Sequence, residues 1–277
     1  MKIGILTIAT GKYSIYLPGL IESCENLFLS DYEKKYFIYT DSDLDSLGKF
    51  EGSEKATIIH QEKLGWPYDS MMRFHMFDAF KDVIGEMDYV FFMNANMKVT
   101  SVVDESILPK ENQCGIVVTE HPGYYKKLTF PHEDRAISEF YVNPNERKIY
   151  FQRCFNGGRS QEFLKMSGIL KTKMDRDLSK SIIPTWHDES ALNWYLINKD
   201  PLILPPVYAY PEHCDGNSVK KALLENNEES DLPLLGSDFV AAENGDDPFR
   251  HILEDFTEHK IIQRNKNLDG GKIYLRK

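Results

Sequence analysis

Two asparagines close the most apolar segment of the chain. The run Tyr89-Val90-Phe91-Phe92-Met93 stops at Asn94-Ala95-Asn96. Consecutive apolar residues indicate a strand buried on both faces, and the polar end of such a strand lies at the sheet edge where open α/β folds bind ligands. An Asp-x-Asp pair there would hold a divalent cation against a diphosphate. Because both positions carry amides, we expect a site that neutralises a diphosphate without a metal; the competing interpretation is a pair of turn residues.

A second concentration of polar and aromatic side chains lies at Trp186-His187-Asp188-Glu189-Ser190-Ala191-Leu192-Asn193. An aromatic ring can cover the apolar face of a sugar while carboxylates accept its hydroxyl protons. Acidic residues also favour helix N-termini, so a purely structural role for Asp188 and Glu189 stays open. The cluster predicts either a sugar site or the start of a helix.

Three weaker motifs have plain structural interpretations. Asp41-Ser42-Asp43 is a literal Asp-x-Asp, but its setting after a strand favours a turn. The segment Asn156-Gly157-Gly158-Arg159 could bring backbone N–H groups close to a ligand, although a turn before a helix is favoured. His121, before Pro122, joins an imidazole to aromatic residues at a strand end, where a lone histidine is more often structural.

The elements that must position these residues alternate along the chain. Strands are expected at residues 2–8, 36–40, 56–60 and 89–93, the first and last of them buried, and a further apolar run lies at 115–119. Helices are expected at residues 16–29, at 70–83 with Asp69 as N-cap, from near Ser160, and at 189–196. Alternating strands and helices predict an α/β fold with a doubly wound, mostly parallel sheet and helices on both faces.

The second half of the chain is more polar. Residues 121–147 form an aromatic-dotted stretch longer than an ordinary connection, and long loops are often functional. An acidic segment at about 215–258 predicts a mobile insertion, and a basic tail follows it. We expect one domain over 1–277, with a nucleotide-binding half at 1–120 and an acceptor-binding half at 121–277.

Composition excludes some classes of function. The 277 residues include 43 acidic and 33 basic ones, a formal charge of −10, which argues against a nucleic-acid surface. The four cysteines are far apart, so free thiols are expected and a zinc site is not. Without a signal-peptide pattern or a transmembrane segment of ~20 apolar residues, we expect a cytoplasmic protein.

Read in order, these motifs resemble glycosyltransferase family 6, which includes the histo-blood-group A and B transferases and the α1,3-galactosyltransferases. The resemblance covers nearly the whole chain. Its carriers are Gly11-Lys12-Tyr13, Tyr39-Thr40-Asp41, Trp66 with Arg73, Phe92-Met93-Asn94-Ala95-Asn96, His121-Pro122-Gly123-Tyr124-Tyr125, Phe155-Asn156-Gly157-Gly158 and Trp186-His187-Asp188-Glu189-Ser190. Bacterial members are similar to this chain in carrying Asn-x-Asn and in lacking the membrane anchor of the animal enzymes.

The resemblance implies a GT-A fold and a retaining α1,3-transfer of GalNAc or Gal. The donor would be UDP-GalNAc or UDP-Gal, the acceptor the 3-hydroxyl of a galactoside in an oligosaccharide, with fucosylation expected, and no metal or other cofactor. The implied donor-site residues are Ile8, Ala9, Tyr13, Arg73, Asn94, Asn96, Asp188 and Lys266; His121, Trp186 and Glu189 would face the acceptor. Glu189 would be catalytic, either attacking the anomeric carbon or stabilising an oxocarbenium-like centre during same-face attack.

The chain departs from the family pattern at Gln152-Arg153-Cys154, where small or apolar residues tune the choice of donor and acceptor. We therefore expect these three residues to set specificity. Two alternatives stay open: the same fold with a different donor or acceptor, and a glycan- or nucleotide-binding protein without catalysis. Retained Glu189, Asp188 and Lys266 favour an enzyme, since a binder needs no carboxylate at the reacting carbon.

Overall fold

The computed structural model describes residues 1–42 and 52–209. Within them lies a seven-stranded sheet of order β3-β2-β1-β4-β6-β5-β7. The strands are β1 (Lys2–Ile8), β2 (Glu33–Thr40), β3 (Ala56–His60), β4 (Tyr89–Met93), β5 (Ile116–Glu120), β6 (Phe151–Arg159) and β7 (Leu202–Leu204). The α-helices are α1 (Leu17–Leu27), α3 (Tyr68–Met71), α4 (Arg73–Ala79), α5 (Lys81–Ile84), α6 (Ser160–Ser179) and α7 (Asp188–Leu196). The predictions at Asp43, Lys266, Cys214 and the 215–258 insertion fall outside the described residues.

The sheet is mixed but mostly parallel. β1 pairs in parallel with β2 and β4, β2 with β3, and β5 with β7, while β6 runs antiparallel between β4 and β5. The predicted α/β, GT-A-like fold is therefore confirmed. The sheet combines strands from both sides of residue 120, and the proposed division into two functional halves stays a prediction.

Strand β4 is buried on both faces, as its apolar sequence predicted. Phe91 packs edge-on against Phe28 of the α1 side, with ring centroids 5.1 Å apart. Its neighbour Phe92 points the other way, 5.7 Å from Phe77 of α4, which in turn lies 5.8 Å from Phe163 of α6. Alternating side chains thus join two hydrophobic cores through one strand.

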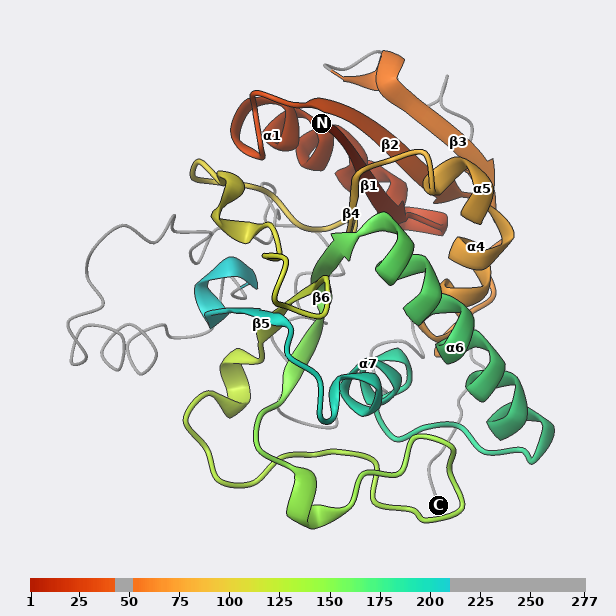
Figure 1. Ribbon diagram of the computed structural model, residues 1–277. Coiled ribbons are helices and arrows are strands. Elements are labelled where there is room, and N and C mark those ends of the chain that lie inside the picture. The colour runs from red at the N-terminus through yellow and green to blue at the C-terminus, as the bar shows by residue number, and fades with distance from the viewer. Residues whose placement is uncertain (43–51, 210–277) are drawn as a thin grey trace.

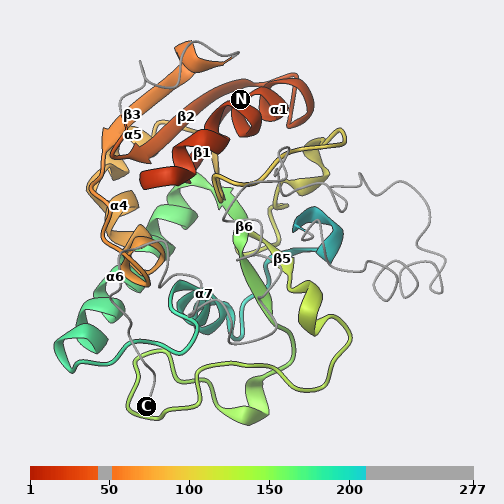
Figure 2. The same cartoon turned by 180° about the vertical axis from the view of Figure 1, so that it is seen from behind.

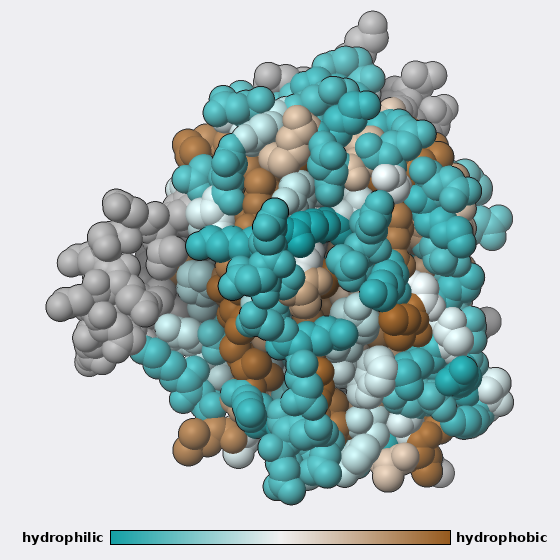
Figure 3. Space-filling model, viewed as in Figure 1, coloured by the Kyte–Doolittle hydropathy of each residue, from teal (hydrophilic) through white to brown (hydrophobic). Residues whose placement is uncertain are grey.

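Helices cover both faces of the sheet. Figure 1 shows α4, α6 and α7 on one side, and the reverse view in Figure 2 shows α1 and the segment after β4 on the other. On the face in Figure 3 most of the surface is hydrophilic, and apolar side chains show in narrow strips and not as one broad patch. No helix among residues 1–42 and 52–209 has the length and apolar character that crossing a bilayer requires.

Strand β6 corrects the expected turn before α6. Asn156, Gly157 and Gly158 all pair with residues of both β4 and β5. A Cβ on Gly157 would lie 2.4 Å from the Val90 carbonyl oxygen, so the glycine permits close approach of two strands and does not make a turn. The glycine pair was predicted to form a turn, whereas it is required for close packing of the strands.

Two helix predictions also need correction. Residues 70–83 form three short helices, because the backbone leaves helical geometry at Met72 (ψ 5°) and Phe80 (ψ 19°). Asp69 does not cap them; it lies inside α3 and accepts a 2.7 Å hydrogen bond from the Leu64 N–H. The expected helix at 16–29 spans Leu17–Leu27 after a 3-10 turn at Gly11–Tyr16.

The long segment between β5 and β6 contains two 3-10 turns and is tied to the second half of the chain. Buried Glu133 accepts hydrogen bonds from the Arg135 guanidinium at 2.7 Å and from the Thr185 N–H at 2.7 Å. Buried Asp177 of α6 accepts a 2.6 Å bond from the Ser138 hydroxyl. These contacts fix the segment beside the loop that leads into α7.

Candidate active site

The carboxyl ends of β1 and β4 meet where the strand order reverses. From β1 the chain builds outward through β2 and β3, then returns to place β4 on the other side of β1. The register that pairs Leu6 with Phe92 puts Ile8 level with Asn94. Such a switch point is where doubly wound sheets bind ligands. Ile8, Ala9 and Asn94 therefore share the edge at which the sequence places a nucleotide.

Each predicted residue at this edge is held by the backbone. The Ala9 N–H donates to the Tyr39 carbonyl at 2.8 Å, and the Asn94 N–H donates to the Cys154 carbonyl at 3.0 Å. Asn94 is half-buried and Asn96 is buried. Tyr13 lies in the 3-10 turn that follows β1, its ring 5.9 Å from that of Tyr16.

Asp41 is a turn residue. Its Oδ1 accepts a 2.7 Å hydrogen bond from the Gly11 N–H, which ties the end of β2 to the turn after β1. Among the described residues, no three His, Cys, Asp or Glu side chains converge as metal ligands. The expectation that the site works without a metal stays a prediction.

Asp188 lies between two guanidinium groups. Its Oδ2 is 3.0 Å from Nη1 of Arg73, on α4, and its Oδ1 accepts a 2.8 Å bond from Nη1 of Arg153, on β6. The side chains of Asp188 and Arg73 are each only 1% exposed. Removing one member of such a buried cluster costs about 3–5 kcal/mol, because the remaining charge loses its partner. Two residues that the sequence assigns to different functions, donor binding and specificity, therefore meet on one carboxylate.

Glu189 is the second buried carboxylate at this site. Its Oε2 accepts a 3.2 Å hydrogen bond from the backbone N–H of Arg153. Burial raises the pKa of Glu189 to about 7, against the nearby Arg153 charge, which acts in the opposite direction. A carboxylate that titrates near neutral pH in a charged, buried setting is characteristic of functional sites.

Arg73 retains hydrogen-bond capacity. Its Nη1 also donates to the Arg153 carbonyl at 3.0 Å, and the guanidinium lies 4.5 Å from the centre of the Phe92 ring. Within the described part of the chain, its Nε and Nη2 have no hydrogen-bond partner. Buried donors of this kind are costly unless a ligand satisfies them.

The start of α7 has a strained backbone at His187 and is held in place by side-chain contacts. His187, which precedes α7, has φ 56° and ψ −123°, a conformation that costs a non-glycine residue on the order of 1–3 kcal/mol. Its ring packs 4.8 Å from that of Trp66. Buried Asn193 accepts from the Phe151 N–H at 2.8 Å and donates to the Glu189 carbonyl at 2.9 Å. These contacts hold the two carboxylates against β6.

His121 follows β5 at the same edge of the sheet and belongs to an aromatic cluster. Its ring lies 5.0 Å from that of Tyr124 and 5.8 Å from that of Tyr150. Burial lowers the pKa of His121 to about 4, so its imidazole is neutral at pH 7. Burial raises the pKa of Tyr150, and the Glu189 charge raises it further. The cluster therefore extends the site from Glu189 toward His121.

The other predicted residues have separate contacts. Trp186 is half-buried, and its backbone N–H donates to the Ser190 hydroxyl at 2.9 Å. Gln152 donates to the Ala209 carbonyl at 2.9 Å, and its Oε1 accepts from the Cys154 thiol at 2.7 Å. Of the predicted specificity residues, the structure gives Arg153 contacts with both carboxylates, whereas Gln152 and Cys154 contact each other.

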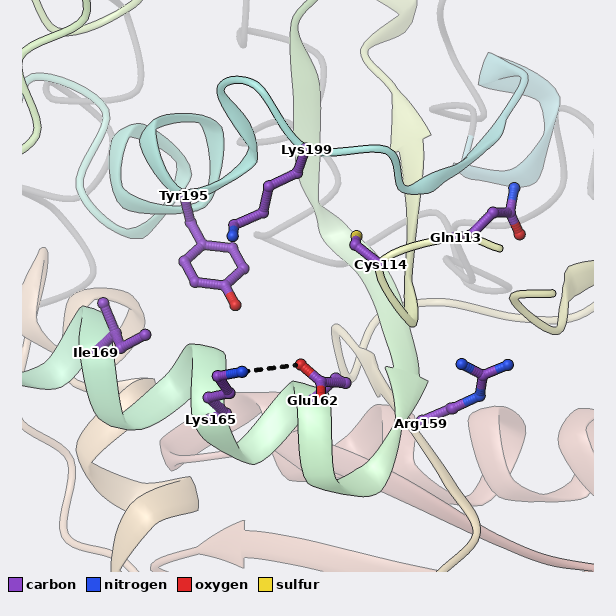
Figure 4. A pocket seen from close by; sticks show the side chains of 8 residues that line it. All are labelled: Gln113, Cys114, Arg159, Glu162, Lys165, Ile169, Tyr195 and Lys199. Carbon is purple, nitrogen blue, oxygen red and sulfur yellow. Dashed lines mark ion pairs between the residues drawn. The ribbon is translucent and has the colours of Figure 1, made fainter. Parts of the chain in front are cut away.

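A separate depression of about 380 Å³ lies at the far end of α7. Figure 4 shows its lining from the turn before β5, the end of β6, α6, α7 and the segment after α7: Gln113, Cys114, Arg159, Glu162, Lys165, Ile169, Tyr195 and Lys199. An ion pair of 3.6 Å joins Lys165 to Glu162 along α6. None of the predicted site residues within 1–42 and 52–209 lines this depression.

A GT-A-like sheet whose carboxyl edge gathers buried carboxylates and guanidiniums defines a glycosyltransferase-like enzyme, and comparison with known proteins gives the family. Residues 1–229 match glycosyltransferase family 6. The chain belongs to this family, as its motifs predicted.

Its relatives include bacterial and animal transferases. The chain is similar to the O-antigen biosynthesis glycosyltransferase WbnI of Escherichia coli, 33% identical over 230 residues that cover 82% of this chain and 96% of the relative. It is also similar to histo-blood group ABO system transferase 1 of Rattus norvegicus, 28% identical over 77% of this chain and 62% of the relative. Globoside alpha-1,3-N-acetylgalactosaminyltransferase 1 of Homo sapiens is 27% identical over 86% of this chain and 69% of the relative.

Three residues of the site were given no role from the sequence. Trp66 lies against the Arg153 guanidinium, the Glu189 charge acts on Tyr150, and Asn193 donates to the Glu189 carbonyl. Trp66 and Asn193 stand in motifs that the sequence singles out, which was a usable signal. Tyr150 lies in apolar surroundings typical of core residues, so only the tertiary structure reveals its contacts.

Proposed function

We propose that this chain is a retaining α1,3-glycosyltransferase that moves GalNAc or Gal from a UDP-sugar to the 3-hydroxyl of a galactoside. The proposal depends most on one observation: a buried Glu189 with a pKa of about 7 stands next to Asp188, at the ligand-binding edge of the sheet. A carboxylate there can attack the anomeric carbon or stabilise its positive charge, as transfer with retention requires. The Homo sapiens relative, a globoside alpha-1,3-N-acetylgalactosaminyltransferase, supports the α1,3 linkage.

The donor would bind across the β1–β4 edge. Ile8, Ala9 and Tyr13 would surround the uridine, and Asp188 would accept hydroxyl protons of the donor sugar. Departure of UDP leaves negative charge on a phosphate, which cationic donors can offset. The Nε and Nη2 of Arg73, which have no hydrogen-bond partner among the described residues, supply such donors, and Lys266 is a second candidate from the sequence. With Asn94 and Asn96 in place of carboxylates, we propose that these cations act without a divalent metal.

The acceptor would approach from the His121 side. The neutral imidazole and the half-buried Trp186 can contact the polar and apolar faces of a galactoside. The Escherichia coli relative acts in O-antigen biosynthesis, so we propose a saccharide of a surface polysaccharide, with fucose next to the accepting galactose, as the natural acceptor.

A UDP-release assay in EDTA tests this proposal. UDP-GalNAc, UDP-Gal, UDP-GlcNAc and UDP-Glc are each offered with 2′-fucosyllactose, with lactose as the matched acceptor and with no acceptor. Acceptor-dependent release from UDP-GalNAc or UDP-Gal identifies the donor, and proton NMR of the product then reads linkage and anomeric configuration. Activity that appears only with Mn²⁺ would overturn the metal-free mechanism.

Two other readings have distinct results in the same assay. Release from a different donor would indicate the same fold with altered specificity, consistent with Arg153 in the site. Tight binding of UDP by calorimetry without turnover of any donor, in EDTA and in Mn²⁺, would indicate a binding protein. Either result would replace the proposed activity.

A further inference from the structure

Arg153 contacts both site carboxylates with different groups. Its backbone N–H donates to Glu189 at 3.2 Å, and its guanidinium donates to Asp188 at 2.8 Å. The backbone carbonyl of Arg153 in turn accepts from Nη1 of Arg73 at 3.0 Å and from Nδ2 of Asn156 at 2.8 Å. One residue of β6 therefore links α4, β6 and the start of α7 around the site.

The guanidinium of Arg153 is also held on its flat side. It lies 5.5 Å from the centre of the Trp66 ring, and its side chain is only 14% exposed. Stacking and a directed ion pair together fix a planar guanidinium in a way that an ammonium group does not reproduce. The position is thus built for arginine and not for positive charge alone.

We propose that Arg153 is a positioning residue that holds Asp188 and Glu189 as a pair facing one ligand, with Glu189 ionised. The inference deepens the proposed function, because it explains how a buried acid at the reacting carbon keeps its charge. Two buried acids side by side repel each other, and burial itself favours the neutral form. The fixed Arg153 guanidinium, which pairs with Asp188 and whose charge also acts on Glu189, opposes these effects.

The groups around Glu189 support this assignment. Those that interact with its charge come from its own helix, from α4, from β6 and from the segments before β6: Asp188, Arg73, Arg153, Cys154, Tyr150 and Tyr124. Two of them are cations. Burial is the largest influence on the pKa of Glu189 and raises it. The Arg153 charge is the next largest and lowers that pKa.

The test is the pH dependence of kcat/KM in Arg153→Met, Arg153→Lys and Arg159→Met. Methionine keeps the backbone N–H and most of the side-chain volume but removes the charge. We expect the acidic limb of the profile to move up by about one pH unit, so that activity falls about five-fold at pH 7 and less than about two-fold at pH 9. In Arg153→Lys the retained positive charge should make the upward shift of the acidic limb smaller than in Arg153→Met.

Arg159→Met is the matched control. Arg159 lies at the other end of β6, where it donates to the Pro109 carbonyl at 3.2 Å, away from both carboxylates. Its acidic limb should stay that of the unmodified protein. If Arg153→Met lowers activity equally at all pH values, or leaves the limb in place, the positioning role is wrong and Arg153 acts in packing alone.

A second readout does not require turnover. With ¹³C-labelled glutamate carboxylates, the Glu189 NMR signal is assigned by its loss in Glu189→Gln, and its titration is followed in each variant. The midpoint should rise in Arg153→Met, rise less in Arg153→Lys and stay fixed in Arg159→Met; an unchanged midpoint overturns the inference. If no donor is turned over but the midpoint shifts, the proposed function fails while the inference stands. Should Arg153→Met not fold, Arg153→Lys decides by the same midpoint.

Discussion

The two ends of α7 differ in charge, burial and shape. At its start, Asp188 and Glu189 are 1% and 6% exposed and contact cations or backbone donors. At its other end an open depression is lined by exposed charges, including Lys165 and Glu162 with side chains 65% and 40% exposed. The open end has the larger cavity, yet the buried carboxylates and guanidiniums of the proposed site lie at the other end. The proposed site is therefore distinguished by buried charges and not by open volume.

The energies of the two ends explain this difference. An exposed ion pair such as Lys165–Glu162 contributes about 0–1 kcal/mol, because water screens both charges. Burying ionised groups costs several kcal/mol each unless partners compensate. A fold that places two acids and two arginines together in its interior therefore gives up stability, which is typical of catalytic centres. Substitutions at the two ends should separate activity from packing.

The largest effect is expected for Glu189→Gln. The amide keeps the volume but cannot attack or stabilise an oxocarbenium-like centre, so kcat should fall at least ~10³-fold, about 4 kcal/mol of barrier. The affinity for UDP, measured by calorimetry, should change by less than about three-fold, because the nucleotide is expected at the β1–β4 edge. Undiminished turnover would remove Glu189 from the mechanism.

Asp188→Asn should have the next largest effect. Arg73 and Arg153 would then face an amide in place of a carboxylate, and the free energy of unfolding should fall by about 3 kcal/mol. Urea denaturation of the variant measures this loss. Glu62→Gln, at an exposed position in the segment after β3, is the comparison and should change stability by less than about 0.5 kcal/mol. Equal losses in the two variants would mean that the Asp188 carboxylate does not compensate the buried Arg73 and Arg153 charges.

Much of the fold could be predicted because its strands carry unmixed apolar sequence. β1, β3 and β4 have the expected bounds. β1 and β4 are mostly buried, and consecutive apolar residues of this kind have few other conformations. β6 was missed because its sequence contains Gln152, Arg153, Asn156 and a glycine pair. Those polar groups are satisfied by α4, α7 and neighbouring backbone, which no local pattern reveals.

The site, like the fold, could be predicted where local sequence motifs carry it and not where distant segments meet. Asp188 and Glu189 stand in a dense motif and were identified from it, and the resemblance added Arg73. The meeting of Arg73 and Arg153 on Asp188 was not predictable, because three elements far apart in the chain must pack before it exists. Family position alone suggested that Arg153 sets specificity; only the structure shows its contacts with both acids.

The pH dependence of stability offers a third test. The folded-state pKa of Glu189 is about 7, above its ordinary value of 4.5, so the folded protein holds this proton more tightly than the unfolded chain. Ionised Glu189 therefore destabilises the fold, with the full cost above pH 7 and almost none below pH 4.5. Glu189→Gln should raise the free energy of unfolding by about 2 kcal/mol at pH 8 and by much less at pH 4.5. Urea melts at the two pH values measure it, and an equal gain at both would show that charge is not the cause.

The smallest effect is expected at the open end of α7. Lys165→Ala removes an exposed ammonium and its 3.6 Å pair with Glu162 on α6, and alanine is a good helix former, so stability should change by less than about 0.5 kcal/mol. Donor and acceptor kinetics should stay within about two-fold of the unmodified chain. If Lys165→Ala changed KM for the acceptor while leaving the free energy of unfolding intact, the depression would be part of the acceptor surface. The contrast between the two ends would then be one between catalysis and recognition, and not between a site and an ordinary surface.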